Sequence, residues 1–123
     1  MATLNNRVFD NGLTTLDTEA NKVLVTSQEA STYAEANSTY ALGNSTSLSI
    51  GAPADRSGGG RKVAVASITD GSVTATGTAT HYALVDTSNS RLLATGSLTA
   101  SQAVTSGNTF TLATFDIGIP DPA

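Results

Sequence analysis

Residues 79–98, ATHYALVDTSNSRLLATGSL, place the chain's single histidine, His81, five positions before Asp86 and among several serines. Histidine, aspartate and serine are the parts of a nucleophilic hydrolase, in which aspartate orients the histidine that acts as the base. Side chains on a strand alternate between its two faces, so this odd separation directs His81 and Asp86 to opposite faces. No serine lies in a Gly-x-Ser-x-Gly turn. We therefore expect His81 to be a packing residue and the protein not to be an enzyme.

The glycine-rich stretch GAPADRSGGGRK, residues 51–62, suggests a phosphate site, because backbone N–H groups of such turns can cradle phosphate. A P-loop, however, continues through Gly-Lys-Ser/Thr into a helix. Here Gly60 is followed by two basic residues and then by an apolar, strand-like run. We interpret the stretch as a mobile loop whose basic side chains meet acidic groups on another protein. These side chains are Arg56, Arg61 and Lys62.

Metal and cofactor chemistry finds no support in the spacing of the residues. The turn DTSNS, residues 86–90, offers one carboxylate, whereas a calcium loop needs several. The chain has no cysteine, which excludes disulfides, thiolate zinc sites and cysteine nucleophiles. We expect no catalytic residue, no bound metal and no cofactor.

Charge and hydropathy restrict the partners. The net charge is −4, and the longest basic run is Arg61-Lys62, so neutralisation of phosphates could not drive nucleic-acid binding. No run of 18 apolar residues could span a bilayer, and the start MATLNNRVFD has neither the basic flank nor the apolar stretch of a signal peptide. We expect a protein that is made in the cytoplasm and binds neither nucleic acid nor membrane.

Alternation of apolar and polar residues predicts the strands that must position these groups. In SVTATGT, residues 72–78, apolar residues alternate with Ser and Thr, and NTFTLA repeats the pattern with Phe110 and Leu112 inward. The dipeptide Asp70-Gly71 predicts a two-residue hairpin turn, residues 86–90 and 105–108 predict longer turns, and Asn11-Gly12 a weaker one. We expect a mainly β protein, an antiparallel β-sandwich or barrel-like fold, forming one domain over residues 1–123.

One helix and two extended ends complete the expected fold. Thr26 precedes Glu29 by three residues, the spacing of a capping box, so a short α-helix is expected over about residues 27–37. Residues 1–9 are expected to form an extended N-terminal arm. The prolines in IGIPDPA favour an extended tail over residues 118–123.

Three stretches together resemble small proteins encoded among the head genes of tailed bacteriophages. They are NRVFDNGLTTLDTEANKVLVTSQEASTYAEA, GAPADRSGGGRKVAVASITDGSVTATGTATHYALVDTSNSRLLATGSLTASQAV and GNTFTLATFDIGIPDPA, and they cover nearly the whole chain. The resemblance implies a virion structural protein, a capsid decoration or cement protein on the exterior of the head. Its partners would be the major capsid protein and neighbouring copies of itself.

The residues expected to bind these partners lie in the loop and at the two ends of the chain. They are Arg7, Phe9, Arg56, Arg61, Lys62, Ile119, Pro120 and Pro122. Two alternatives remain open at this point. One is a receptor- or carbohydrate-binding module of a tail fibre or spike, although the chain has no Trp and only three Tyr for stacking on sugars. The other is a head-completion or tail component.

Overall fold

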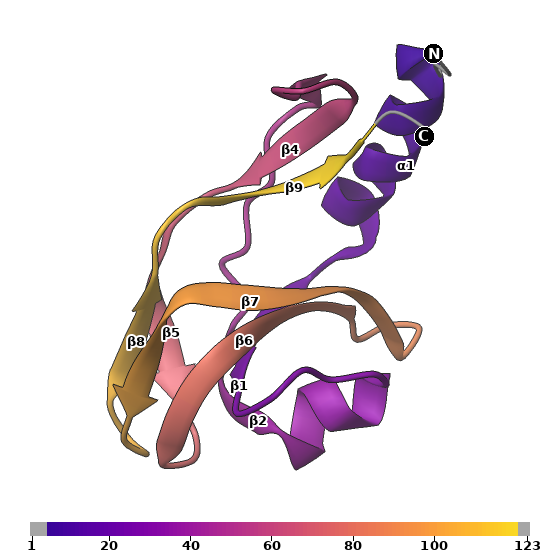
Figure 1. Ribbon diagram of the computed structural model, residues 1–123. Coiled ribbons are helices and arrows are strands. Elements are labelled where there is room, and N and C mark those ends of the chain that lie inside the picture. Colours follow the sequence, from indigo (N-terminus) through magenta and orange to yellow (C-terminus); the bar gives the residue numbers. More distant parts are fainter. Residues whose placement is uncertain (1–4, 121–123) are drawn as a thin grey trace. The chain divides into compact units, whose positions relative to one another are not determined.

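The computed structural model of the protein describes residues 5–120 (Figure 1). Within that range the chain is mainly β and antiparallel, as the sequence predicts. Nine described strands form two sheets. No described helix is long and apolar enough to span a membrane. The chain forms two compact units. That residues 1–123 form one domain stays a prediction. Alternation identifies strands but does not reveal which strands share a sheet.

The first unit contains the described parts of Met1–Glu19, Ser49–Ser67 and Ala113–Ala123. Its elements are the helix α1 (Asn6–Glu19) and the strands β3 (Ala54–Asp55), β4 (Arg61–Val65) and β9 (Phe115–Ile119). The strands form an antiparallel sheet in the order β3-β4-β9, and α1 contacts β4. The unit is held together by buried apolar side chains from the helix and from one face of β4, namely Phe9, Leu13, Val63 and Val65.

Helix α1 occupies part of the segment that was expected to be an extended arm over residues 1–9. The helix is capped by Asn5, whose side-chain oxygen accepts a hydrogen bond from the backbone N–H of Arg7 at 2.9 Å. An oxygen-bearing side chain before the first helical residue satisfies an N–H group that has no partner within the helix. The arm prediction is therefore wrong from Asn6 onward, and residues 1–4 lie outside the described range.

The turn expected at Asn11-Gly12 is also wrong, because both residues lie inside α1. Phe9 and Leu13 are buried at a spacing of four residues, which puts them on one face of the helix. This amphipathic pattern outweighs the turn tendency of the Asn-Gly pair.

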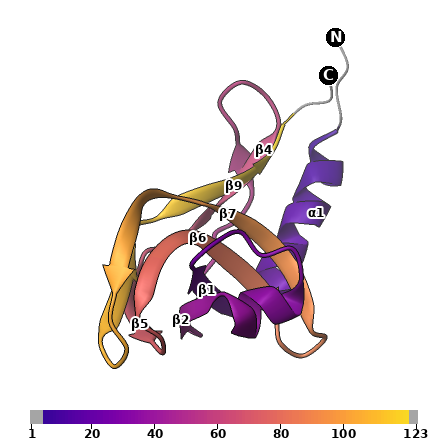
Figure 2. The ribbon, with the colours of Figure 1, turned by 60° about the horizontal axis from the view of Figure 1, so that its bottom comes forward.

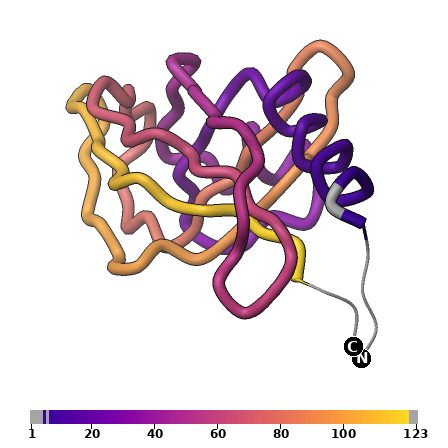
Figure 3. The backbone as a smooth tube through the Cα atoms, turned by 90° about the horizontal axis from the view of Figure 1, so that it is seen from above, coloured from indigo at the N-terminus to yellow at the C-terminus, as the bar shows by residue number. Residues whose placement is uncertain are grey.

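Residues 51–62, expected as a mobile loop, include a β-hairpin in which Ala54 pairs with Lys62 and Asp55 with Arg61. In Figure 3 this hairpin is the open magenta loop of the first unit. The backbone φ angles are 88° at Gly58, 105° at Gly59 and 90° at Gly60, a region that side-chain-bearing residues rarely adopt. The run of three glycines is therefore required by the geometry of the turn. Mobility of the segment stays a prediction.

The expected tail over residues 118–123 begins inside a strand. Gly118 pairs with Lys62 and Ile119 with Arg61 across β9 and β4. Pro120, which follows, is exposed. Residues 121–123, including Pro122, lie outside the described range.

The second unit comprises residues 20–48 and 68–112. Its antiparallel sheet has the order β7-β6-β1-β2-β5-β8 and is strongly curled (Figure 2). A short π-helix, η1 (Glu35–Thr39), packs on this sheet. The strands are β1 (Lys22–Thr26), β2 (Ala41–Ser45), β5 (Ile68–Val73), β6 (Gly77–Asp86), β7 (Arg91–Val104) and β8 (Thr109–Leu112).

Both faces of the central strands are buried, which explains why their sequences are apolar without alternation. On one face, Leu24, Ala83 and Val85 form a cluster with Ala36 of η1. Neighbours on the strands point the opposite way, so Val23 and its paired residue Leu84 lie on the other face, and both are fully buried.

The two edge strands of this sheet are joined by a side chain. The Gln102 amide on β7 donates to the backbone carbonyl of Thr111 on β8 at 3.0 Å, and its oxygen accepts from the Thr111 N–H at 3.4 Å. One glutamine thus supplies the donor and the acceptor that a neighbouring strand would supply. This contact gives the curled sheet a barrel-like closure.

The hairpin turn expected at Asp70-Gly71 is wrong, because β5 runs through both residues. Gly71 has no positive φ angle; its lack of a side chain makes room for the ring of Phe110, which a Cβ atom would meet. The strand expected over residues 72–78 is interrupted after Val73, although burial still alternates along it. The turns at residues 86–90 and 105–108 are confirmed.

The helix expected over about residues 27–37 lies later in the chain, at residues 33–39. Thr26 ends β1 instead of capping a helix. A second Thr-x-x-Glu pattern, Thr32 to Glu35, precedes the helix that forms. Thr32 Oγ1 accepts a hydrogen bond from the Glu35 N–H at 3.1 Å, and the Glu35 carboxylate accepts one from the Ser31 N–H at 2.8 Å. The two patterns are equivalent in sequence, and the continuation of β1 through Thr26 decides between them.

Candidate functional site

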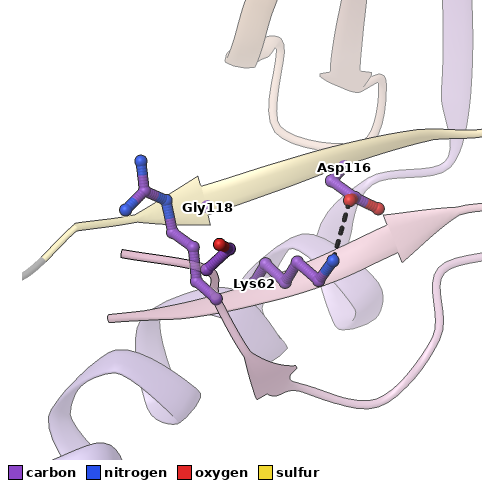
Figure 4. Close-up of a pocket in the computed structure, with 5 residues that line it drawn as sticks. Lys62, Asp116 and Gly118 are labelled. Atoms are coloured by element: carbon purple, nitrogen blue, oxygen red, sulfur yellow. Dashed lines mark hydrogen bonds and ion pairs between the residues drawn. The ribbon is translucent and has the colours of Figure 1, made fainter. Parts of the chain in front are cut away.

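A groove in the first unit gathers several of the charged side chains that the sequence singled out. It has a volume of about 370 Å³ and lies on the three-stranded sheet (Figure 4). It is lined by Arg56, Ser57, Lys62, Asp116 and Gly118, and is called the Arg56 groove below.

Strand alternation places these residues on the face of the sheet that the buried valines do not occupy. On β4, Val63 and Val65 are buried on one face. Lys62 directly precedes Val63 and therefore points to the opposite face. On β9, Asp116 and Gly118 are exposed and alternate with half-buried apolar residues. Lys62 is paired with Gly118, and its ammonium lies 3.0 Å from the Asp116 carboxylate (Figure 4).

Arg56 reaches this face from the turn that follows β3. A Cβ atom on Gly118 would lie 2.9 Å from Arg56 Cδ and 3.2 Å from Nε, so the arginine side chain crosses β9 at the position where β9 has no side chain. Its Nη1 donates to the carbonyl of Gly59 at 2.9 Å, which holds the guanidinium against the hairpin turn. The remaining guanidinium N–H groups are donors that can serve a ligand.

Arg61 belongs to a different environment from its two basic neighbours. Its guanidinium bonds Asp10 of α1 at 2.9 Å and Asp55 of β3 at 2.7 Å, and its side chain is 17% exposed. The hydrogen bonds that Arg61 donates to these two carboxylates raise the pKa of Arg61 above its ordinary value. Arg61 therefore ties the helix to the hairpin and is not part of the groove.

The other residues expected to contact a partner do not converge on the groove. Phe9 is 1% exposed and belongs to the core of the first unit, so its expected role in binding is replaced by a packing role. Arg7 is exposed on α1, and Ile119 is half-buried on β9. Pro120 is exposed directly after that strand, and Pro122 lies outside the described residues.

Asp116 and Gly118 were not identified from the sequence. The signal is present in FDIGI, residues 115–119, where Phe115, Ile117 and Ile119 alternate with the two groove residues. The two prolines that follow favour an extended tail over residues 118–123, which overlaps the end of this alternation.

The structure does not bring His81 and Asp86 together. His81 Nδ1 lies 2.8 Å from the hydroxyl of Thr80. Asp86 is buried at the end of β6, where it accepts hydrogen bonds from the side chain of Asn89 at 2.8 Å and from the backbone of Ser88 at 3.0 Å. The Asn89 hydrogen bond, followed by that from Ser88, lowers the pKa of Asp86. The carboxylate orders the turn between β6 and β7.

Across the described residues, no group of three His, Cys, Asp or Glu side chains is arranged to hold a metal ion. The Arg56 groove offers instead two cationic groups beside one carboxylate, with a serine at the rim. These groups can form hydrogen bonds and ion pairs with a ligand.

Comparison of the chain with family models, with curated proteins and with solved structures gives no match.

Proposed function

We propose that the protein is a virion structural protein of a tailed bacteriophage, a capsid decoration or cement protein that binds the outer surface of the head. Its partner is the major capsid protein, together with neighbouring copies of itself. The proposal is supported by the resemblance of the sequence to proteins encoded among phage head genes and by a composition dominated by small polar and small apolar residues.

The observation that carries the proposal is the charge state of the Arg56 groove. Lys62 and Arg61 are already paired with carboxylates of the same unit. Arg56 contacts a backbone carbonyl and, among the described residues, has no carboxylate partner. Arg56 is half-buried, and a guanidinium with donors left over for a ligand is typical of a surface that contacts another protein.

The alternative of a carbohydrate-binding module is less well supported by the positions of the tyrosines. Tyr33 and Tyr40 pack against the apolar cluster under η1, and a Cβ atom on Gly96 would lie 2.6 Å from the ring of Tyr82. These rings serve packing within the second unit, whereas sugar recognition needs an open aromatic face.

A sedimentation assay tests the proposal. Purified protein is mixed with purified heads of the phage that carries the gene, and the heads are pelleted. We expect the protein to pellet with heads in a saturable manner and to remain in solution with tails alone. Binding to tails or fibres, with none to heads, would support the alternatives and contradict the decoration role.

A further inference from the structure

We infer that the Arg56 groove binds a carboxylate side chain in an acidic segment of the partner protein, with Arg56 as the principal contact. This inference rests on the proposed function, because it assumes that the partner is a protein. It adds the chemistry by which the partner is recognised.

The charge balance of the groove favours a single carboxylate. Arg56 and Lys62 contribute two positive charges, and Asp116 contributes one negative charge. One additional carboxylate would make the groove neutral. The Lys62 and Asp116 side chains are 36% and 50% exposed, so their ion pair remains open to a third group from solvent.

The geometry favours contact through the guanidinium. Because Gly118 has no side chain, Arg56 lies across β9 with its Cδ and Nε close to the strand. The bond from Nη1 to Gly59 fixes the orientation of the guanidinium before a ligand arrives, which reduces the entropy lost on binding. A planar guanidinium presents parallel N–H donors that match the two oxygens of a carboxylate.

The position of β9 at the edge of its sheet allows an extended segment of the partner to reach the groove. β9 is an edge strand whose sheet neighbour is β4, and its five pairs with β4 run without a register shift. Edge strands can accept a further strand from a partner, whose alternate side chains then enter neighbouring pockets. A segment beside β9 would lie next to Gly118, where Arg56 crosses.

Nucleic acid offers phosphates, which a guanidinium also binds, but the groove is poorly suited to a polyanion. Asp116 lies inside it, and the whole chain carries a net charge of −4. A chain of phosphates would be repelled both by Asp116 and by the net negative charge of the protein. A single carboxylate would contact only the groove, where Arg56 and Lys62 supply two positive charges.

The test is a titration of the full-length protein with a short peptide of alternating glycine and aspartate, followed by NMR of the backbone amides. A peptide with asparagine in place of aspartate is the control ligand. We expect shifts at Ser57, Lys62 and Gly118 with the acidic peptide alone. An oligonucleotide that binds the groove more tightly than the acidic peptide would overturn the inference.

Variants distinguish binding in the groove from a general effect of the protein's charge. Arg56→Ala is expected to weaken peptide binding about fivefold, the upper range for an exposed ion pair. Arg91→Ala removes the same charge from an exposed position on β7, outside the groove, and should leave peptide binding unchanged. Ser57→Asp places a carboxylate at the exposed rim beside Arg56, and should weaken peptide binding at least as much as Arg56→Ala in a folded protein. Equal effects of Arg56→Ala and Arg91→Ala would overturn the inference.

The same variants distinguish failure of this inference from failure of the proposed function. If heads bind wild-type and Arg56→Ala proteins equally, the groove is not the contact and the decoration role stands. If the acidic peptide binds in the groove but heads do not bind the protein, the groove chemistry stands and the decoration role fails.

Discussion

Single glycines in the second unit are positions where an aromatic ring takes the place of a side chain. The ring of Phe110 on β8 packs against Gly71 on β5, and a Cβ atom on Gly43 of β2 would lie 2.9 Å from the same ring. One aromatic side chain thus covers two strands, and Phe110 is itself 1% exposed. The glycines are required for packing at these positions.

Gly71→Ala is therefore expected to destabilise the protein by about 1 to 3 kcal/mol, the usual cost of adding a methyl group to a filled core. Urea denaturation followed by circular dichroism measures this change. Gly51→Ala is the matched control, because its Cβ atom would lie 3.7 Å from the carbonyl of Ala64, an ordinary contact. Equal stabilities of the two variants would show that the Phe110 ring does not depend on Gly71.

Asp86 provides a second test at the residue scale. Its folded pKa is lowered, chiefly by the hydrogen bond from Asn89, so the stability it contributes is present above the unfolded pKa of an aspartate and is lost as pH falls through the lower folded value. Asn89→Ala should raise the pKa of Asp86 and move this loss of stability to higher pH. NMR titration of the Asp86 carboxyl measures the shift, and an unchanged pKa would contradict the assigned cause.

At the scale of elements, α1 contains a glycine that its conformation does not require. Gly12 lies inside the helix, and a Cβ atom there would lie 3.6 Å from Ile119 Cδ1, an ordinary contact. Alanine is favoured over glycine in a helix interior by about 1 kcal/mol. Gly12→Ala should thus raise the free energy of unfolding by up to that amount in urea denaturation. A loss of stability would mean that residue 12 is not helical in solution.

The closure of the curled sheet depends on one side chain, the Gln102 amide, which joins the edge strands β7 and β8. Gln102→Leu removes both hydrogen bonds to Thr111 and is expected to cost about 1 kcal/mol. Hydrogen exchange of the Thr111 amide should become faster. The exposed Gln28 allows the same substitution as a control, and it should leave this exchange rate unchanged. Unchanged exchange in the Gln102 variant would show that the edges are held together by other contacts.

The elements also show how far the sequence predicts this fold. Alternation identified the mainly β class and the inward side chains Phe110 and Leu112, because strand burial depends on local order along the chain. The turn preference of Asp-Gly gave a wrong prediction at Asp70-Gly71, because the sequence does not distinguish a glycine that makes room for a ring from a distant strand from a glycine that forms a turn. Helix α1 was missed although Asn5, Phe9 and Leu13 follow a capped amphipathic pattern.

The candidate site was predicted in part for a similar reason. Charge and composition identified Arg56 and Lys62, which lie in the groove, but gave Arg61 the same role. Arg61 points away because adjacent strand residues face opposite sides, and its partner Asp10 is 51 positions away in the sequence. Long-range ion pairs of this kind leave no local pattern.

At the scale of the whole molecule, we propose that the protein is a component of the phage head surface. The most direct measurement is electron cryomicroscopy of heads from phage with the intact gene and with the gene deleted. We predict additional density on the outer face of the head at regular lattice positions, present with the gene and restored by adding the purified protein. Heads that look identical in the two preparations, or density confined to the tail, would contradict the decoration role.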